Sequence, residues 1–218
     1  MTNSTLHIRD AGPQDASFLA KSILIAGRAH VTRGIWEVIL GGSEEETLRF
    51  LQVLSITQIP HLFHYSYYLI AEENASGPVG SLGGYDPNIA GYHALQKAIP
   101  EVVRKLNLPA QVSNISKEAK KILACLPKGI EGAWIIDSVA TLPEHRRKGV
   151  SETLLHTILE KGKRQGYSKA QVNMYIGNEP ALKLYRKFGF EIVEDIFDEY
   201  FEKSIGSPGM LSLVKDLR

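Results

Sequence analysis

The sequence predicts an α/β layer structure. The last third of the chain alternates strand-like and helix-like segments, and two earlier β-rich runs are separated by turn-forming residues. The composition, with 44% hydrophobic and 22% charged residues, is close to that of globular proteins and excludes disordered and collagen-like chains. A length of 218 residues is near the upper end of one domain, so we predict a single domain over residues 1–218.

The first 85 residues are predicted to form a strand, two helices and a hairpin. Apolar side chains recur at helical spacing after the first strand, and Ser43 precedes three glutamates as an N-cap would. Residues 74–78 are turn formers, so the β-rich runs on either side are expected to pair antiparallel. The predicted elements are a strand over 6–9, helices over 16–28 and 47–56, and strands over 66–72 and 79–85.

The sequence pattern changes after residue 85. Prolines punctuate helix-prone pieces between residues 86 and 127, and we predict a helical insertion there. Strand and helix patterns then alternate, and Gly189 is placed to end the last helix. The predicted elements are strands over 133–140 and 169–175, helices over 149–163 and 180–188, and closing strands over 190–193 and 210–214.

Charge and cysteine content exclude several classes of protein. The formal net charge of +1 gives no global field for nucleic acid or an anionic membrane, and no window approaches the ~20 apolar residues of a membrane span. Cys125 is the only cysteine, which excludes a disulfide framework and favours a cytoplasmic location. His61 and His64 lack a third ligand in view, so we predict a half-buried aromatic segment and no metal.

The densest functional signal is the basic turn Pro-Glu-His-Arg-Arg-Lys-Gly-Val-Ser at residues 143–151, between a predicted strand and a predicted helix. Backbone N–H groups at a helix start lack intrahelical partners and lie at the positive end of the dipole, so they bind phosphates. Gly149 lets the backbone come close to a ligand, while Arg146, Arg147 and Lys148 add positive charge. The alternative is a solvated basic turn that caps a helix.

The turn resembles the coenzyme A loop of the GCN5-related N-acetyltransferases (GNAT), Arg/Gln-x-x-Gly-x-Gly/Ala. Here the six residues read Arg146-Arg147-Lys148-Gly149-Val150-Ser151, and Ser151 departs from the pattern by adding a hydroxyl near the phosphates. The resemblance implies the acyl-CoA N-acyltransferase fold: a mixed, mostly antiparallel sheet that splays at its centre, with helices on both faces. It also implies acetyl-CoA as cosubstrate, with Val139 and Thr141 pairing with its pantetheine arm.

A second motif follows at residues 178–190, which resemble the late motif of the same family, Asn-x-x-Ala-x-x-x-Tyr-x-x-x-Gly-Phe. Asn178 is a plausible N-cap, and Tyr185 lies on the apolar face of the predicted helix. Spacing alone favours Tyr185 as a core aromatic residue. The resemblance implies instead that Tyr185 protonates the departing thiolate and that Asn178 contacts the pantetheine.

The chemistry implied is direct attack of an amine on the acetyl thioester, without a covalent enzyme intermediate. A base must first deprotonate the ammonium group. Asp137 is one candidate, with side-chain parity that matches Val139 and Thr141, but a structural carboxylate is an equal alternative and Glu131 a weaker candidate. A backbone N–H near Ala140 would meet the oxyanion. Cys125 is interpreted as a buried or incidental thiol and not as a nucleophile.

The acceptor is not fixed by these motifs. The resemblance is strong over residues 134–190, weak over the first 85, and absent over 86–127, so the helices of 34–65 and the insertion are expected to shape the acceptor pocket. We predict acetylation of a small-molecule primary amine, with a slight preference for a compact polar metabolite.

The alternatives to this activity are acetylation of a protein or peptide amine, a non-catalytic acyl-CoA sensor and a nucleic-acid-binding protein. Dimers are common in the family, and the sequence does not decide the oligomeric state. Five tyrosines hint at an aromatic cleft, namely Tyr65, Tyr67, Tyr68, Tyr85 and Tyr92.

Overall fold

The computed structural model describes residues 6–74, 76–109 and 116–218. Ala75 of the predicted hairpin turn and residues 110–115 of the predicted insertion therefore lie outside the described part of the chain. In the described part, no helix has both the length and the apolar character that a membrane span needs.

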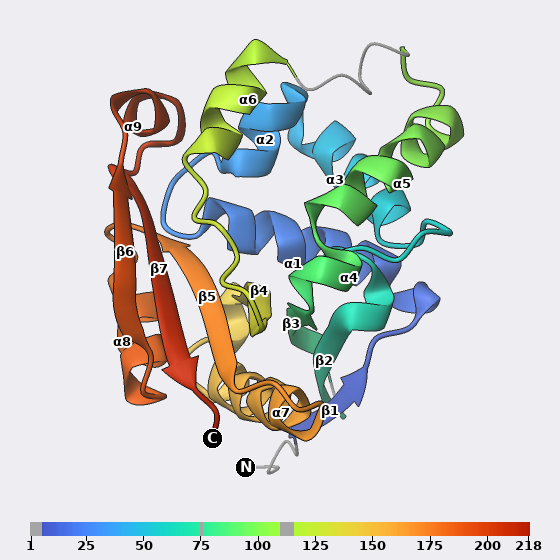
Figure 1. Ribbon diagram of the computed structural model, residues 1–218. Helices are drawn as coiled ribbons and strands as arrows, with labels where there is room; N and C mark the ends of the chain where they lie inside the picture. The colour runs from blue at the N-terminus through green and yellow to red at the C-terminus, as the bar shows by residue number, and fades with distance from the viewer. Residues whose placement is uncertain (1–5, 75, 110–115) are drawn as a thin grey trace.

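A seven-stranded sheet, in the order β1-β2-β3-β4-β5-β7-β6, runs through the described residues (Figure 1). Neighbouring strands are antiparallel except β4 and β5, which are parallel. This mixed, mostly antiparallel sheet confirms the predicted class. The strands are β1 (Leu6–Asp10), β2 (Tyr68–Glu73), β3 (Gly77–Tyr85), β4 (Ala133–Thr141), β5 (Lys169–Tyr175), β6 (Glu191–Phe197) and β7 (Gly209–Asp216).

Helices cover both faces of the sheet (Figure 1). One face packs against α7 (Val150–Arg164) and α8 (Glu179–Lys187), and their apolar residues form one core with the sheet. The other face packs against α1 (Ala16–Arg28), α3 (Glu44–Leu54) and α5 (Tyr92–Lys105). The remaining helices are α2 (Ile35–Leu40), α4 (Pro87–Ala90), α6 (Lys117–Ala124) and α9 (Glu199–Ile205).

Local sequence signals place most of these elements correctly. Ser43 caps α3 as predicted: its hydroxyl accepts from the Glu46 amide at 3.2 Å, while the Glu46 carboxylate accepts from the Ser43 amide at 2.8 Å. Asn178 caps α8, and Gly189 follows its end with φ +80°. The sequence did not predict α9, which lies between the closing strands, and β6 runs four residues beyond its predicted end at residue 193. Helices α4, α5 and α6 occupy the region predicted as an insertion.

The sheet splays between β4 and β5. The two strands pair from Ala133 opposite Lys169 to Ile136 opposite Val172, and the pairing stops there although both strands continue. The edge of β4 that faces β5 therefore has no strand partner from Asp137 to Thr141. The unpaired backbone groups of this edge are free to bind an extended ligand.

A β-bulge lies at the same place on the other edge of β4. Gly83 of β3 lies opposite Asp137 and Ser81 opposite Ala140, so β4 holds one residue more than β3 between these pairs, and Ser138 has φ +50°. The extra residue reverses the alternation of side chains. Asp137 therefore points to the opposite face of the sheet from Val139 and Thr141, and the predicted shared parity is wrong.

Candidate functional site

A cavity of about 1910 Å³ passes through the splay and joins both faces of the sheet. The N-terminus of α7 and the inner face of α8 line one side, and α1, α2, α5 and α6 line the other. Eleven of the twelve residues predicted as the site line this cavity; besides Tyr185 they are Asp137, Val139, Ala140, Thr141, Arg146, Arg147, Gly149, Val150, Ser151 and Asn178. Tyr185, the predicted acid, lines it too, whereas Lys148 is exposed outside its lining.

The basic turn presents backbone to this cavity. Gly149 is the N-cap of α7 with φ +83°, a left-handed conformation that favours glycine, and a Cβ built on it would meet no atom within 4 Å. The space in front of the turn is therefore open. The first helical bond beyond the cap runs from the Thr153 amide to the Gly149 carbonyl at 3.0 Å, so the amides before Thr153 have no partner within α7.

Side chains tie this turn to the end of β4. The hydroxyl oxygens of Thr141 and Ser151 lie 2.8 Å apart, and Arg146 Nε donates to the Thr141 carbonyl at 3.3 Å. The Ser151 hydroxyl is thus hydrogen-bonded to the strand, which fixes the start of α7 beside the splayed edge. An anion bound at the helix start would lie at a set distance from the unpaired backbone of β4.

Asp137 lies at the centre of the splay and is partly exposed to the cavity. Ser138 Oγ donates to Asp137 Oδ1 at 3.0 Å. Burial among protein atoms raises the pKa of the Asp137 carboxyl, and the hydrogen bonds from Ser138 oppose the rise. A carboxylate with a raised pKa binds protons more readily than an exposed one, which suits a general base.

Tyr185 lies across the cavity on α8, with only 5% of its surface exposed. Its ring packs edge-on against Phe190 with centroids 5.8 Å apart. Burial, and secondly the charge of Asp137, raises the pKa of the phenol, so Tyr185 keeps its proton at neutral pH. Tyr185 is therefore a core aromatic residue that also lines the cavity with a protonated phenol.

The sequence profile of the acetyltransferase (GNAT) family matches residues 43–190. The chain belongs to this family. Among curated relatives, it is 37% identical over 65 residues to the uncharacterized N-acetyltransferase YsnE of Bacillus subtilis (strain 168), which is 29% of this chain and 43% of YsnE. It is 31% identical over 75 residues to N-alpha-acetyltransferase 20 of Dictyostelium discoideum, 34% of this chain and 43% of that protein. The matches thus span less than half of either relative.

Solved structures show the same fold over nearly the whole chain. An N-acetyltransferase from Staphylococcus aureus Mu50 superposes with a TM-score of 0.67 at 20% identity, over 96% of this chain and all of that one. The acetyltransferase yncA of Salmonella typhimurium, solved with acetyl-CoA, gives 0.51 at 14% identity, over 98% of this chain and 94% of that one. The acetyltransferase fold predicted from the two motifs is confirmed, and the family and its named members indicate an acyltransferase.

Other candidate residues of this GNAT chain lie away from the splay. Glu131 is exposed in the turn before β4 and does not line the cavity. Cys125 is buried, its thiol donates to the Lys121 carbonyl at 3.3 Å, and burial raises its pKa. His61 and His64 are buried rather than half-buried, and the described residues contain no cluster of three metal-ligating side chains.

Tyr175 and His30 are cavity residues that the sequence did not single out. The Tyr175 hydroxyl donates to the Gly27 carbonyl at 2.7 Å and accepts from the Ile35 amide at 3.2 Å, so the end of β5 is bonded to both α1 and α2. His30 packs edge-on against the Tyr175 ring, with centroids 6.4 Å apart. No sequence motif predicts these contacts, because they join residues about 140 positions apart.

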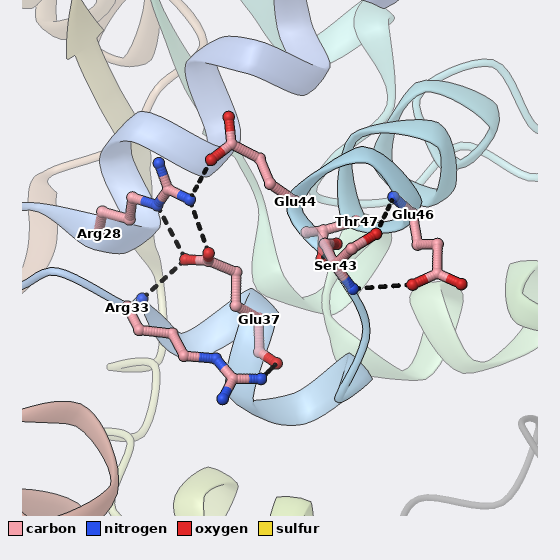
Figure 2. Close-up of polar contacts among 8 residues, drawn as sticks. Arg28, Arg33, Glu37, Ser43, Glu44, Glu46 and Thr47 are labelled. Atoms are coloured by element: carbon pink, nitrogen blue, oxygen red, sulfur yellow. Dashed lines mark hydrogen bonds and ion pairs between the residues drawn. The ribbon is translucent and has the colours of Figure 1, made fainter.

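An ionic cluster connects α2 to α1 and α3 (Figure 2). Arg28 at the end of α1 donates to both carboxylate oxygens of Glu37 at 2.9 and 2.6 Å, and to Glu44 of α3 at 2.6 Å. Glu37 is buried and also accepts from the Gly34 amide at 2.9 Å. The guanidinium of Arg28 holds the pKa of Glu37 below its usual value. Arg28 thus ties α2, which lines the cavity, to α1 and α3.

Proposed function

We propose that this protein transfers an acetyl group from acetyl-CoA to a primary amine of a small molecule. One observation carries the proposal: a single cavity joins the amides at the start of α7, the unpaired edge of β4, the Tyr185 phenol and the Asp137 carboxyl. In this transfer a C–N bond forms between the amine and the acetyl carbon, and the C–S bond of the thioester breaks. An alkylammonium and a thioester give an amide, a free thiol and one proton.

The cofactor side fits coenzyme A. The open space before Gly149 accommodates a pyrophosphate, which the amides of the first turn of α7 would bind, with Arg146 and Arg147 adding charge. The free edge of β4 at Val139 and Thr141 would pair with the amides of the pantetheine arm. Acetyl-CoA supplies the activated acyl group, and yncA supports this assignment, having been solved with it.

Three groups of the chain act on protons and charge. Asp137 removes a proton from the ammonium, so that the amine attacks as a neutral nucleophile. A backbone N–H near Ala140 donates to the carbonyl oxygen on which negative charge develops. Tyr185, whose raised pKa keeps it protonated, gives its proton to the leaving sulfur. Because Asp137 and Tyr185 come from opposite sides of the splay, one can deprotonate the amine while the other protonates the sulfur.

The acceptor side supports a small molecule. Helices α1, α2, α5 and α6 contribute lining residues around the part of the cavity beyond Asp137, as walls around a compact ligand would. A peptide amine is the second candidate, favoured by the match to N-alpha-acetyltransferase 20.

The first test is calorimetric titration with acetyl-CoA, with coenzyme A and dephosphorylated pantetheine as controls. We expect acetyl-CoA to bind at least about tenfold more tightly than pantetheine, since the helix start binds the phosphates. Release of free thiol on addition of primary amines then tests transfer. Binding of acetyl-CoA without thiol release for any amine would favour a sensor over an enzyme, and no binding at all would refute the cofactor assignment.

A further inference from the structure

The acceptor side of the cavity is lined mainly by apolar side chains from helices that are distant in sequence. Trp36 of α2 packs edge-on against Phe63, with ring centroids 4.7 Å apart, so this aromatic wall is held in place. Several lining residues remain only half-buried and turn their free surface toward the cavity. Apolar surface of this kind is stabilised when a ligand covers it. The apolar lining includes Trp36, Ile39, Phe50, Leu95, Ile99 and Leu123.

One carboxylate lies at the floor of this apolar chamber. Among the described lining residues the acidic side chains are Asp137 and Glu152, and Glu152 belongs to the start of α7 on the cofactor side. No lysine, arginine or histidine of the described chain forms an ion pair with Asp137. A carboxylate that is partly removed from water and has no cation beside it carries a desolvation cost, and the ammonium of a substrate would offset that cost.

Phenols surround this carboxylate. Tyr85, Tyr92 and Tyr175 line the same cavity, and the charge of Asp137 adds to burial in raising the pKa of each hydroxyl. An ammonium beside Asp137 would meet aromatic faces and neutral hydroxyls, which favour a cation in an otherwise apolar site. The lysines of the lining, Lys120 and Lys128, are exposed and so belong to its rim.

We infer that the acceptor is a primary amine on an aromatic or branched aliphatic body without a second charge. Its ammonium would bind beside Asp137 and its body between α2 and α5. This inference rests on the proposed acetyl transfer and replaces the polar metabolite that the sequence favoured. A polyamine would bury a further cation against the apolar wall, and an amino acid would bring a carboxylate close to Asp137.

The test compares four amines and one peptide by thiol release: 2-phenylethylamine, 3-methylbutylamine, L-phenylalanine, spermidine and Phe-Gly-Gly. We expect kcat/KM for both apolar amines to exceed that for spermidine and L-phenylalanine by at least about tenfold. A preference for L-phenylalanine or for Phe-Gly-Gly would overturn the absence of a second charge, and a preference for spermidine would overturn the apolar body. Any of these preferences would leave the proposed acetyl transfer intact.

A binding measurement separates the two levels of the proposal. Calorimetric titration of 2-phenylethylamine into the protein saturated with coenzyme A measures the affinity of the apolar chamber for the amine, because no acetyl group is present to be transferred. Binding without acetylation of any amine would refute the proposed function and support the ligand class. Absence of both binding and turnover for the apolar amines, with spermidine still acetylated, would refute the inference alone.

Two variants localise the effect. Ile39→Glu places a second carboxylate on the α2 wall, and we expect it to lower kcat/KM for 2-phenylethylamine at least about tenfold and to raise it for spermidine. Ile192→Glu is the matched control, since Ile192 is 41% exposed on β6 and outside the lining. If Ile39→Glu does not fold, Tyr92→Lys serves at a side chain that is 47% exposed. Its ammonium would compete for Asp137 and weaken amine binding, and unchanged amine binding would refute the docking at Asp137.

Discussion

On the cofactor side of the cavity, the groups offered to a ligand are mostly backbone amides at the start of α7 and along the edge of β4. On the acceptor side they are side chains carried by α1, α2, α5 and α6. Most of the proposed cofactor side comes from one stretch, residues 138–151, to which α8 adds Asn178 and Tyr185, whereas the proposed acceptor side draws on segments from residue 25 to Tyr175. A ligand site made of backbone groups needs only a strand, a glycine turn and a helix start, so a short sequence motif can predict it. A site made of side chains from distant segments has no such motif.

This difference predicts that the two sides can be disabled independently, and the largest effect is expected on the cofactor side. Gly149→Asp would place a carboxylate at a left-handed position facing the phosphates. We expect acetyl-CoA affinity in calorimetry to fall by about 100-fold or more, because like charges brought together cost several kcal/mol. Gly77→Asp is the matched control, since Gly77 also has φ +69° and open space around it. Retained affinity in Gly149→Asp would move the phosphate site elsewhere.

Asp137 joins the two sides, and its removal should abolish most turnover while sparing cofactor binding. We expect Asp137→Asn to lower kcat/KM by about 100-fold or more, the usual contribution of a general base. In the wild type, the rate should rise with pH through the raised pKa of Asp137, and this rise should vanish in the variant. Asp195→Asn on exposed β6 is the control. A pH profile unaltered by Asp137→Asn would assign the base elsewhere.

The same variant should alter stability in a defined pH window. Because the folded pKa of Asp137 lies above its unfolded value, the folded protein binds more protons there and loses stability as pH rises between the two values. Asp137→Asn should therefore melt at a higher temperature than wild type above this window. The difference should shrink below it, where both proteins carry a neutral group. Thermal melts across pH 3–8 measure this, and a lower melting temperature at pH 8 would contradict it.

Tyr185→Phe is expected to have a smaller effect, confined to the chemical step. Loss of the phenol proton should lower kcat by about 10- to 100-fold, because water can replace it in part. Acetyl-CoA affinity should change by less than about twofold, since the ring and its contact with Phe190 remain. Tyr167→Phe removes a phenol that donates to Asp86 at 2.7 Å away from the splay, and serves as control. An unchanged kcat would assign the proton donor to another group.

The smallest effect on activity is expected from Arg28→Gln, which loosens the acceptor wall at a distance. We expect KM for the amine to rise about 3- to 10-fold with acetyl-CoA affinity unchanged, because α2 loses its tie to α1 and α3. Unfolding free energy should fall by about 2–4 kcal/mol as buried Glu37 loses its partner.

Arg9→Gln separates this effect from general destabilisation. Arg9 donates to both carboxylate oxygens of buried Asp15 at 2.8 Å, in the same manner as Arg28 does to Glu37, but no residue of 6–15 lines the cavity, whereas α2 does. Both variants should lose similar stability, and the amine KM should rise in Arg28→Gln alone. A rise in both would mean that lost stability, and not the α2 wall, changes amine binding.

The bulge in β4 shows most clearly where the sequence misleads. Alternation along the strand predicted a shared face for Asp137, Val139 and Thr141, which would have placed the proposed base beside the pantetheine arm. One inserted residue with Ser138 at φ +50° turns Asp137 to the acceptor face instead. Nothing in Ile-Asp-Ser-Val-Ala marks a bulge, because its position depends on the register with β3.

The sequence by itself determined the α/β class, the capped helices α3 and α8, and the position of the basic turn before α7. These features depend on contacts between residues a few positions apart, where propensity, capping and glycine conformation are decisive. Only the tertiary structure decided which face Asp137 occupies, that Tyr175 and Arg28 hold α1 and α2 together, and that the cavity between α2 and α5 is apolar. Those features arise from register and from packing between distant segments, which local sequence patterns do not encode.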